Sequence, residues 1–160
     1  MIRLAKKEDL PKLLAIYDYA KKFMAAAGNP TQWNGAYPDP ETLENDIQND
    51  WLFVIESEGA VCGVFALIYG EEPCYGELHG GSWGSSTPYA TVHRIAGDGT
   101  KSGLFAECVQ FALERYDHLR VDTHPDNIPM QKAIAKAGFV KRGTVYVEDG
   151  SPRYAYDYIR

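Results

Sequence analysis

The stretch GDGTKSGLF, residues 97–105, decides the fold class that this sequence predicts. Its glycines stand between an apolar strand pattern over residues 89–96 and an amphipathic helix pattern over residues 103–115. Glycine permits backbone dihedrals closed to other residues, and a helix that begins there presents unpaired N–H groups and the positive end of its dipole. An anion such as a phosphate suits that position. Taken alone, Gly97-Asp98-Gly99 is more typical of a simple tight turn, so the flanking sequence has to decide.

The residues around this loop predict a parallel strand–helix–strand crossover. Strand 89–96, helix 103–115 and strand 119–122 follow one another within about 30 residues, the usual length of this unit. Further out, apolar residues at three- and four-residue steps predict a helix at 10–28, and cap and proline signals predict helices at 41–49 and 127–137. Strand patterns around turn residues appear at 2–4, 51–57, 60–69, 139–147 and 153–159.

The whole chain is therefore predicted to have an α/β (α+β) fold. We expect a mixed, mostly antiparallel sheet with one parallel βαβ crossover and flanking helices. No linker or internal repeat interrupts residues 1–160, so we expect a single domain. Residues 70–88 form a long connection rich in glycine and serine, and connections of that length are usually functional or mobile.

Composition narrows the class of partner. The 45% hydrophobic and 24% charged residues indicate an ordinary globular protein. A net charge of −6 without a basic cluster argues against nucleic acid and leaves room for a cationic substrate. The chain has no apolar run long enough for a signal peptide or a membrane span, so we expect a cytoplasmic protein that binds no membrane. Its three cysteines lack metal-ligand spacing, and we expect no metal site.

Four segments together resemble the GNAT (Gcn5-related) N-acetyltransferase superfamily over essentially the whole chain. They are IRLAKKEDLPKLLAIY (2–17), VHRIAGDGTKSGLF (92–105), VDTHPDN with MQKAIAKAGF (121–139) and GTVYVEDGSPRYAYDYI (143–159). They are similar to the family's first strand and helix, its pyrophosphate loop, its second cofactor segment and its closing hairpin. The resemblance implies acetyl-CoA (coenzyme A) as the cofactor and an amine as the acetyl acceptor.

The resemblance assigns cofactor contacts to the loop and to the segments beside it. The residues implied are Arg94, Ile95, Ala96, Lys101, Ser102, Gly103, Leu104, Asn127 and Gln131. The family's signature is Gln/Arg-x-x-Gly-x-Gly/Ala, of which residues 100–105 keep only the central Gly103, with little room expected above its α-carbon. Lys101 is expected to replace the cation missing at Thr100, and Phe105 either packs into the core or crowds the cofactor. Asn127 is equally suited to cap the following helix.

One further departure from the family lies in that helix. Where many members carry a tyrosine that protonates the departing thiolate, this chain has Ile134. We expect Ile134 to be a packing residue, with a water molecule or a hydroxyl such as that of Tyr146 completing the proton transfer.

Three side chains are candidates for the catalytic base. Asp122 comes first, because the resemblance places it where some peptide- and protein-N-terminal members carry a catalytic glutamate; the alternative is a structural carboxylate. His93 and His124 follow, since imidazole titrates near neutral pH, although a histidine in a strand is more often a packing residue. The resemblance assigns polarisation of the thioester carbonyl to the backbone of residues 93–96, and such donors contribute strongly to acyl transfer.

Residues of the irregular segments are candidates for the acceptor site. Trp33, Tyr37 and Trp83 lie outside periodic stripes, which favours pocket walls over core packing. Glu77, with its neighbour His79, is either an acceptor ligand or a solvated surface residue.

The sequence thus leaves two functions open. The first is an acetyl-CoA-dependent N-acetyltransferase acting on a primary amine of a small molecule, amino acid or peptide by direct attack in a ternary complex. The second is a non-catalytic acyl-CoA-binding or protein-interaction module. The retained Gly103 and Asn127 favour the enzyme, whereas Ile134 and the altered signature favour the module. We expect a monomer or homodimer in either case.

Overall fold

The computed structural model describes residues 1–160 as a seven-stranded sheet covered by helices on both faces. The strands are β1 Ile2–Leu4, β2 Leu52–Ser57, β3 Ala60–Tyr69, β4 Ala90–Gly97, β5 His118–Thr123, β6 Val140–Tyr146 and β7 Pro152–Ile159. The helices are α1 Leu10–Ala26, α2 Pro40–Gln48, α3 Leu104–Leu113 and α4 Ile128–Lys136, with short 3-10 helices at Lys7–Asp9 and Pro73–Tyr75. Every predicted strand and helix is present in the predicted order, so the expected fold class is confirmed.

Local sequence signals explain where the helices begin and end. Asp39 caps α2 by accepting a hydrogen bond from the Thr42 N–H at 2.8 Å, and Pro40 occupies the first turn. Gly138 follows α4 with a φ of +95°, the left-handed conformation that ends helices and that glycine adopts without penalty.

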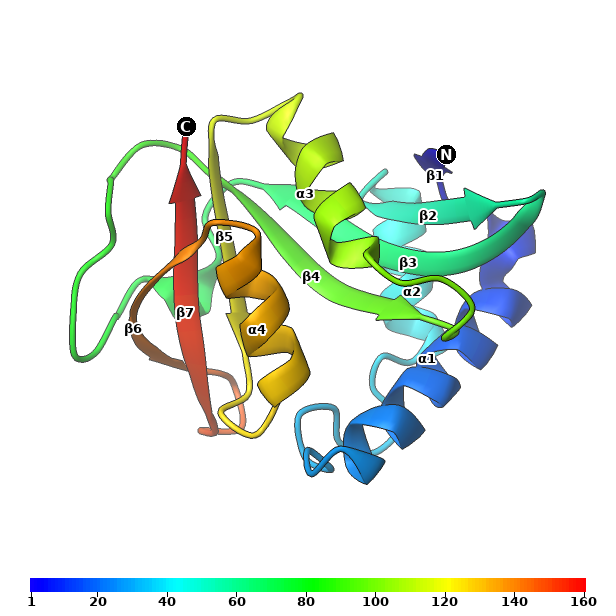
Figure 1. Cartoon of the computed structure of the whole chain (residues 1–160), viewed down its shortest axis with the longest axis horizontal. Coiled ribbons are helices and arrows are strands. Elements are labelled where there is room, and N and C mark those ends of the chain that lie inside the picture. The colour runs from blue at the N-terminus through cyan, green and yellow to red at the C-terminus, as the bar shows by residue number, and fades with distance from the viewer.

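The strand order is β1-β2-β3-β4-β5-β7-β6, and all neighbours are antiparallel except β4 and β5. That parallel pair is short, because only Ala90 with Leu119 and Thr91 with Arg120 are in register. Beyond Thr91 and Arg120 the two strands diverge, which Figure 1 shows as a widening gap between β4 and β5. The sheet is therefore split into two halves joined at one end.

Two hydrophobic layers hold the helices against the sheet. On one face, α3 and α4 cover a cluster of 15 buried residues, and Figure 1 shows these two helices in front of the strands. On the other face, α1 and α2 cover a second cluster that includes Leu13, Leu43 and Val64. None of the helices combines the length and the apolar composition that crossing a bilayer requires.

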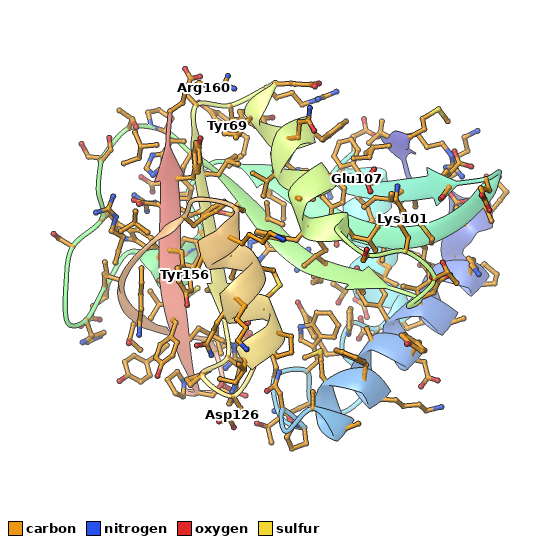
Figure 2. All side chains as sticks on the ribbon, viewed as in Figure 1. Tyr69, Lys101, Glu107, Asp126, Tyr156 and Arg160 are labelled. Atoms are coloured by element: carbon orange, nitrogen blue, oxygen red, sulfur yellow. The ribbon has the colours of Figure 1, made fainter.

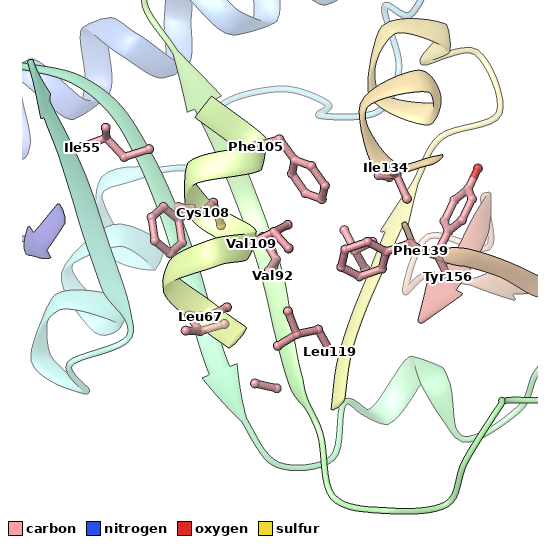
Figure 3. Packing of buried hydrophobic residues seen from close by; sticks show 14 of the residues in the cluster. Ile55, Leu67, Val92, Phe105, Cys108, Val109, Leu119, Ile134, Phe139 and Tyr156 are labelled. Carbon is pink, nitrogen blue, oxygen red and sulfur yellow. The ribbon is translucent and has the colours of Figure 1, made fainter. Parts of the chain in front are cut away.

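Ile134 belongs to the first of these layers. Its side chain is fully buried, and Figure 3 shows it pointing from α4 toward Phe139 and Tyr156 in the core. Phe105 is buried in the same cluster, so it packs inward rather than over the helix N-terminus. Both residues are thus core residues of the α3–α4 layer.

Candidate active site

The divergence of β4 and β5 opens a cavity of about 950 Å³. Residues from both faces of the sheet line it. Val92 and Val121 also belong to the core under α3 and α4, and because side chains alternate along a strand, their neighbours His93 and Asp122 face the α1–α2 side. The cavity therefore joins the two faces of the sheet through the gap between the strands.

His93 and Asp122 occupy equivalent places on the two diverging strands. Each lies two residues beyond the last residue of the parallel ladder, Thr91 on β4 and Arg120 on β5. Crevices beside the carboxyl ends of such strands are the usual ligand sites of open α/β sheets. Two of the three predicted base candidates are thus brought to one cavity.

The His93 side chain lies beside a carboxylate that the sequence did not single out. Glu72 lines the same cavity, with its Oε2 3.5 Å from Nε2 of His93. The adjacent imidazole lowers the pKa of Glu72 below its ordinary value, so Glu72 is charged at neutral pH. The Glu72 N–H also donates to the Tyr89 hydroxyl at 2.8 Å, which fixes the chain at this point. This geometry suits an imidazole oriented by a carboxylate.

Asp122 is held by a buried tyrosine. The Tyr75 hydroxyl donates to Oδ2 of Asp122 at 2.5 Å, and the Tyr75 ring packs against Trp83 at a centroid distance of 5.3 Å. Burial, followed by the neighbouring Asp122, raises the pKa of Tyr75 far above its ordinary value. Tyr75 is therefore a hydrogen-bond donor to Asp122 and a poor source of protons. Trp83, expected in the acceptor site, instead supports Tyr75 and lies outside the cavity lining.

Strand β4 contains a bulge directly after His93. Its register with β3 pairs His93 with Ala66 and Ala96 with Val64, which leaves Arg94 and Ile95 opposite the single residue Phe65. Arg94 has a φ of +52°, which is rare for a residue with a long side chain. Its guanidinium binds the Asp46 carboxylate at 2.7–3.0 Å, and Arg94 lines the cavity. Ile95 lines the cavity, whereas Ala96 is buried in the α1–α2 layer.

The connection between α1 and α2 closes one side of the cavity. Trp33 and Tyr37 line it as expected, and the Tyr37 hydroxyl accepts a hydrogen bond from Arg94 at 3.1 Å. Gln32 reaches across the gap, because its Oε1 accepts from Nδ2 of Asn127 at 2.9 Å. Asn127 also caps α4 by accepting from the Met130 N–H at 3.2 Å. The predicted cap is thus present, and Asn127 also lines the cavity.

His124, the third base candidate, lies outside the cavity lining. Its Nδ1 accepts from the Asp126 N–H at 3.0 Å, and its Nε2 is 3.3 Å from the Thr31 hydroxyl. Burial, with a contribution from Arg153, lowers the pKa of His124, which favours the neutral ring. These contacts indicate that His124 organises the loop after β5.

The glycine loop and the start of α3 form a separate surface. Gly103 is the N-cap of α3 with a φ of +76°, no side chain caps the helix, and a Cβ at Gly103 would meet no protein atom within 4 Å. We expected little room above the α-carbon of Gly103, and this is wrong, because no protein atom fills that space. The positive φ, rather than crowding, is what requires glycine at this position. Lys101 pairs with Glu107 at 2.9 Å, and Figure 2 shows both side chains at the beginning of α3. The start of α3 is thus uncapped, with Lys101 beside it, an arrangement that suits an anion.

The remaining predicted residues have mainly structural surroundings. Glu77 is exposed and lies 3.5 Å from His79, which pairs with β6 through Thr144, and neither lines the cavity. Gln131 donates to the Pro125 carbonyl at 2.7 Å. Leu104 starts α3 and approaches Gly97, where a Cβ would come within 2.5 Å of it. Tyr146 lines the cavity from β6.

Sequence reasoning missed three residues that line the cavity, Gln32, Asp46 and Glu72. It also missed Tyr75, which lies outside the lining and donates to Asp122. Glu72 and Tyr75 share one weak signal, because both belong to the long connection 70–88 that was expected to be functional or mobile.

Comparison with solved structures agrees with the fold and the motifs. A GNAT-family acetyltransferase from Streptococcus agalactiae 2603 matches with a TM-score of 0.90 and 28% identity over 100% of this chain and 95% of that chain. Two others share the fold: a ribosomal-protein-alanine N-acetyltransferase from Brucella melitensis (TM-score 0.61, 24% identity, 100% and 99% covered) and the aminoglycoside acetyltransferase AAC(6')-Ib in complex with coenzyme A and kanamycin (0.64, 18%, 100% and 94%). No family model and no curated protein sequence matches the chain. Because the fold matches over the full length and the motifs occur in the predicted order, the chain belongs to the GNAT (Gcn5-related) N-acetyltransferase superfamily.

Proposed function

We propose that this protein is an acetyl-CoA-dependent N-acetyltransferase that acetylates a primary amine of a small molecule, amino acid or peptide in a ternary complex. The observation that carries the proposal is the cavity between β4 and β5, where His93 and Asp122 lie on equivalent positions of the two diverging strands. His93 is paired with Glu72, and Asp122 accepts a hydrogen bond from Tyr75. Such paired acid–base groups in a cavity suit proton removal from an amine.

The start of α3 suits the pyrophosphate of the cofactor. Its N–H groups have no side-chain cap, Gly103 leaves open space above them, and Lys101 supplies a cation. Each nearby carboxylate has a lysine beside it, since Asp98 lies 3.9 Å from Lys12 and Glu107 pairs with Lys101. Acetyl-CoA bound there would supply the activated acetyl group. The donor set therefore fits an anion despite the acidic residues around it.

The residues of the cavity then have separate tasks. Oδ2 of Asp122 is taken by Tyr75, which leaves Oδ1 to accept an N–H of the acceptor and orient its nitrogen. His93 accepts the proton of the amine, and Glu72 orients the ring and stabilises its positive charge. The bulge at Arg94 and Ile95 interrupts the β3–β4 ladder where β4 lines the cavity, and the family resemblance gives carbonyl polarisation to the backbone at this position.

One observation favours a second candidate, a non-catalytic acyl-CoA-binding or interaction module. Ile134 is an apolar residue buried in the core, so it does not replace the tyrosine that the family resemblance places at this position to protonate the thiolate. A thiolate with a pKa near that of cysteine, about 8.5, leaves at modest cost without such an acid, which keeps the enzyme as our first proposal.

Calorimetry with acetyl-CoA, followed by a thiol-release assay against amines, separates the candidates. The panel contains amino acids, diamines, an aminoglycoside and peptides with free N-termini. Binding with turnover of at least one amine is the result we expect. Binding without turnover of any amine favours the module, and absence of binding contradicts both proposals.

A further inference from the structure

We propose that Tyr17 of α1 and Asp46 of α2 are positioning residues for the β4 bulge, because they hold Arg94 in its left-handed conformation and thereby fix the direction of the backbone N–H groups that follow. The inference rests on the proposed function, since it concerns the bulge that is assigned to carbonyl polarisation. Neither residue touches the reacting atoms in this assignment; both act through Arg94.

The conformation of Arg94 is the starting point. A φ of +52° brings the Cβ of an L-residue close to its own backbone, and outside turns it is uncommon for residues other than glycine, asparagine and aspartate. Arg94 lies within strand β4, between His93, which is in register with Ala66, and the unpaired Ile95; the register with β3 resumes at Ala96. Strained residues of this kind persist where the surrounding structure restrains them from more than one side, and they concentrate at functional sites.

The first restraint acts on the backbone. The Tyr17 hydroxyl donates to the Arg94 carbonyl at 2.6 Å, and the Tyr17 side chain is buried with its ring edge-on to Trp33. Burial raises the pKa of Tyr17 far above its ordinary value, so the hydroxyl remains a donor. A fixed carbonyl defines one side of the peptide that links Arg94 to Ile95, and therefore the direction of the Ile95 N–H.

The second restraint acts on the side chain. Nε and Nη2 of Arg94 donate to both oxygens of Asp46 at 2.7–3.0 Å, a bidentate arrangement with little rotational freedom. The Asp46 side chain is 2% exposed and that of Arg94 is 12% exposed. A buried ion pair loses much of its Coulomb attraction to desolvation, and fixing a unique geometry is a recognised use of such pairs.

The two restraints come from the helices that cover the α1–α2 face, and they act on the strand that carries His93. Asp46 and Tyr37, which also binds Arg94, line the cavity. The wall of the cavity and the bulge are thus one connected unit. Loss of either restraint is expected to release Arg94 to an extended φ and to turn the Ile95 N–H away.

A ligand-free measurement tests the conformational part. Backbone chemical shifts of Arg94 report its φ directly in the purified protein and in the variants Tyr17→Phe and Asp46→Asn. We expect left-handed shifts in the native protein and a move toward extended values in both variants. Left-handed shifts retained in both folded variants would overturn the inference whatever the protein's activity. Tyr17→Phe removes a single hydroxyl and keeps the test available if Asp46→Asn fails to fold.

A rescue experiment tests the positioning part. In the Asp46→Asn background, Arg94→Gly and Arg94→Ala remove the same side chain, but only glycine adopts a positive φ without penalty. With an amine that the native protein acetylates, we expect kcat of the glycine variant to exceed that of the alanine variant by about tenfold, equal to about 1.4 kcal/mol. Acetyl-CoA affinity should be equal in the two. Equal kcat values contradict a positioning role.

A second readout needs no turnover. The carbonyl stretching frequency of bound acetyl-CoA labelled with ¹³C at the thioester carbon should be lowered by the native protein and less so by Tyr17→Phe. Failure of the native protein to bind acetyl-CoA would contradict the proposed function, whereas the Arg94 shifts would still decide the conformational claim. Binding with identical frequencies in both proteins would contradict the positioning claim alone.

Discussion

The loop before α3 and the cavity between β4 and β5 are built in different ways. The loop consists of consecutive residues whose backbone conformation, with Gly99 at a φ of +84° and Gly103 at +76°, leaves N–H groups unpaired at a helix start. The cavity is defined by side-chain pairs from distant parts of the chain: Tyr75 and Asp122 are 47 positions apart, and Arg94 and Asp46 are 48. The loop is therefore defined by its backbone conformation, and the cavity is defined by side-chain contacts between residues far apart in the sequence.

The difference suggests a division of roles. Uncapped N–H groups and one lysine bind any group of suitable charge, so the loop suits a constant part of a ligand such as a phosphate. In the cavity, each charged residue of the bulge and of the two strands already has a protein partner that fixes its orientation. Such preorganised groups suit chemistry more than affinity. Substitutions in the two regions should therefore affect different measurements.

The largest effect is expected in the cavity. His93→Gln and Asp122→Asn should each lower kcat/KM by about a hundredfold, the usual contribution of a positioned proton-transfer or orienting group, and leave acetyl-CoA affinity unchanged. Steady-state kinetics with calorimetry checks both. His79→Gln, a histidine outside the cavity, is the matched control and should keep native turnover.

Comparison of the His93→Gln and Asp122→Asn variants also identifies the catalytic base. If His93→Gln retains native kcat/KM and only Asp122→Asn loses it, then Asp122 is the base and His93 is a packing residue. A loss of acetyl-CoA affinity in either variant would break the proposed separation between loop and cavity.

A smaller effect is expected at the loop. Gly103→Glu places a negative charge at the anion site and should weaken coenzyme A binding by about tenfold, or about 1.4 kcal/mol. Gly103→Asn is the matched control, because asparagine tolerates positive φ and adds no charge. Calorimetry on both folded variants gives the comparison. Equal affinity for the glutamate and asparagine variants would remove the charge argument, and a lower kcat at unchanged affinity would place Gly103 in the chemistry instead.

These two regions also mark how far the sequence was informative. Periodicity and turn residues predicted every strand and α-helix but neither of the short 3-10 helices. The glycine loop was predicted because its signal is local. Asp122 was predicted from the family resemblance and His93 from the ordinary titration range of imidazole, but their equivalent positions depend on a parallel register of only two residue pairs. The bulge at Arg94, which directs its side chain to Asp46, left no pattern in the sequence. Glu72 and Tyr75 were hidden within an irregular connection, where periodicity gives no information.

The smallest effect is expected at His124, which lies after β5 beside the cavity without lining it. Burial and Arg153 lower its folded-state pKa below the unfolded value of 6.5. Between those two values the unfolded state binds more protons than the folded state, so the free energy of unfolding falls as the pH falls. This contribution is fully present above pH 6.5 and is lost on acidification toward the folded pKa.

His124→Asn removes this titration while keeping an acceptor for the Asp126 N–H, which the native ring binds through Nδ1 at 3.0 Å. Urea unfolding at pH 7 and pH 5.5 should therefore show a smaller loss of stability on acidification for His124→Asn than for the native protein, because the other titrating groups are common to both. Turnover at pH 7 should be unchanged, since the ring does not line the cavity. An unchanged pH dependence would mean that His124 charges as readily in the folded protein as in the unfolded chain. A large loss of turnover would instead place His124 within the active site and extend the cavity's chemistry beyond the two diverging strands.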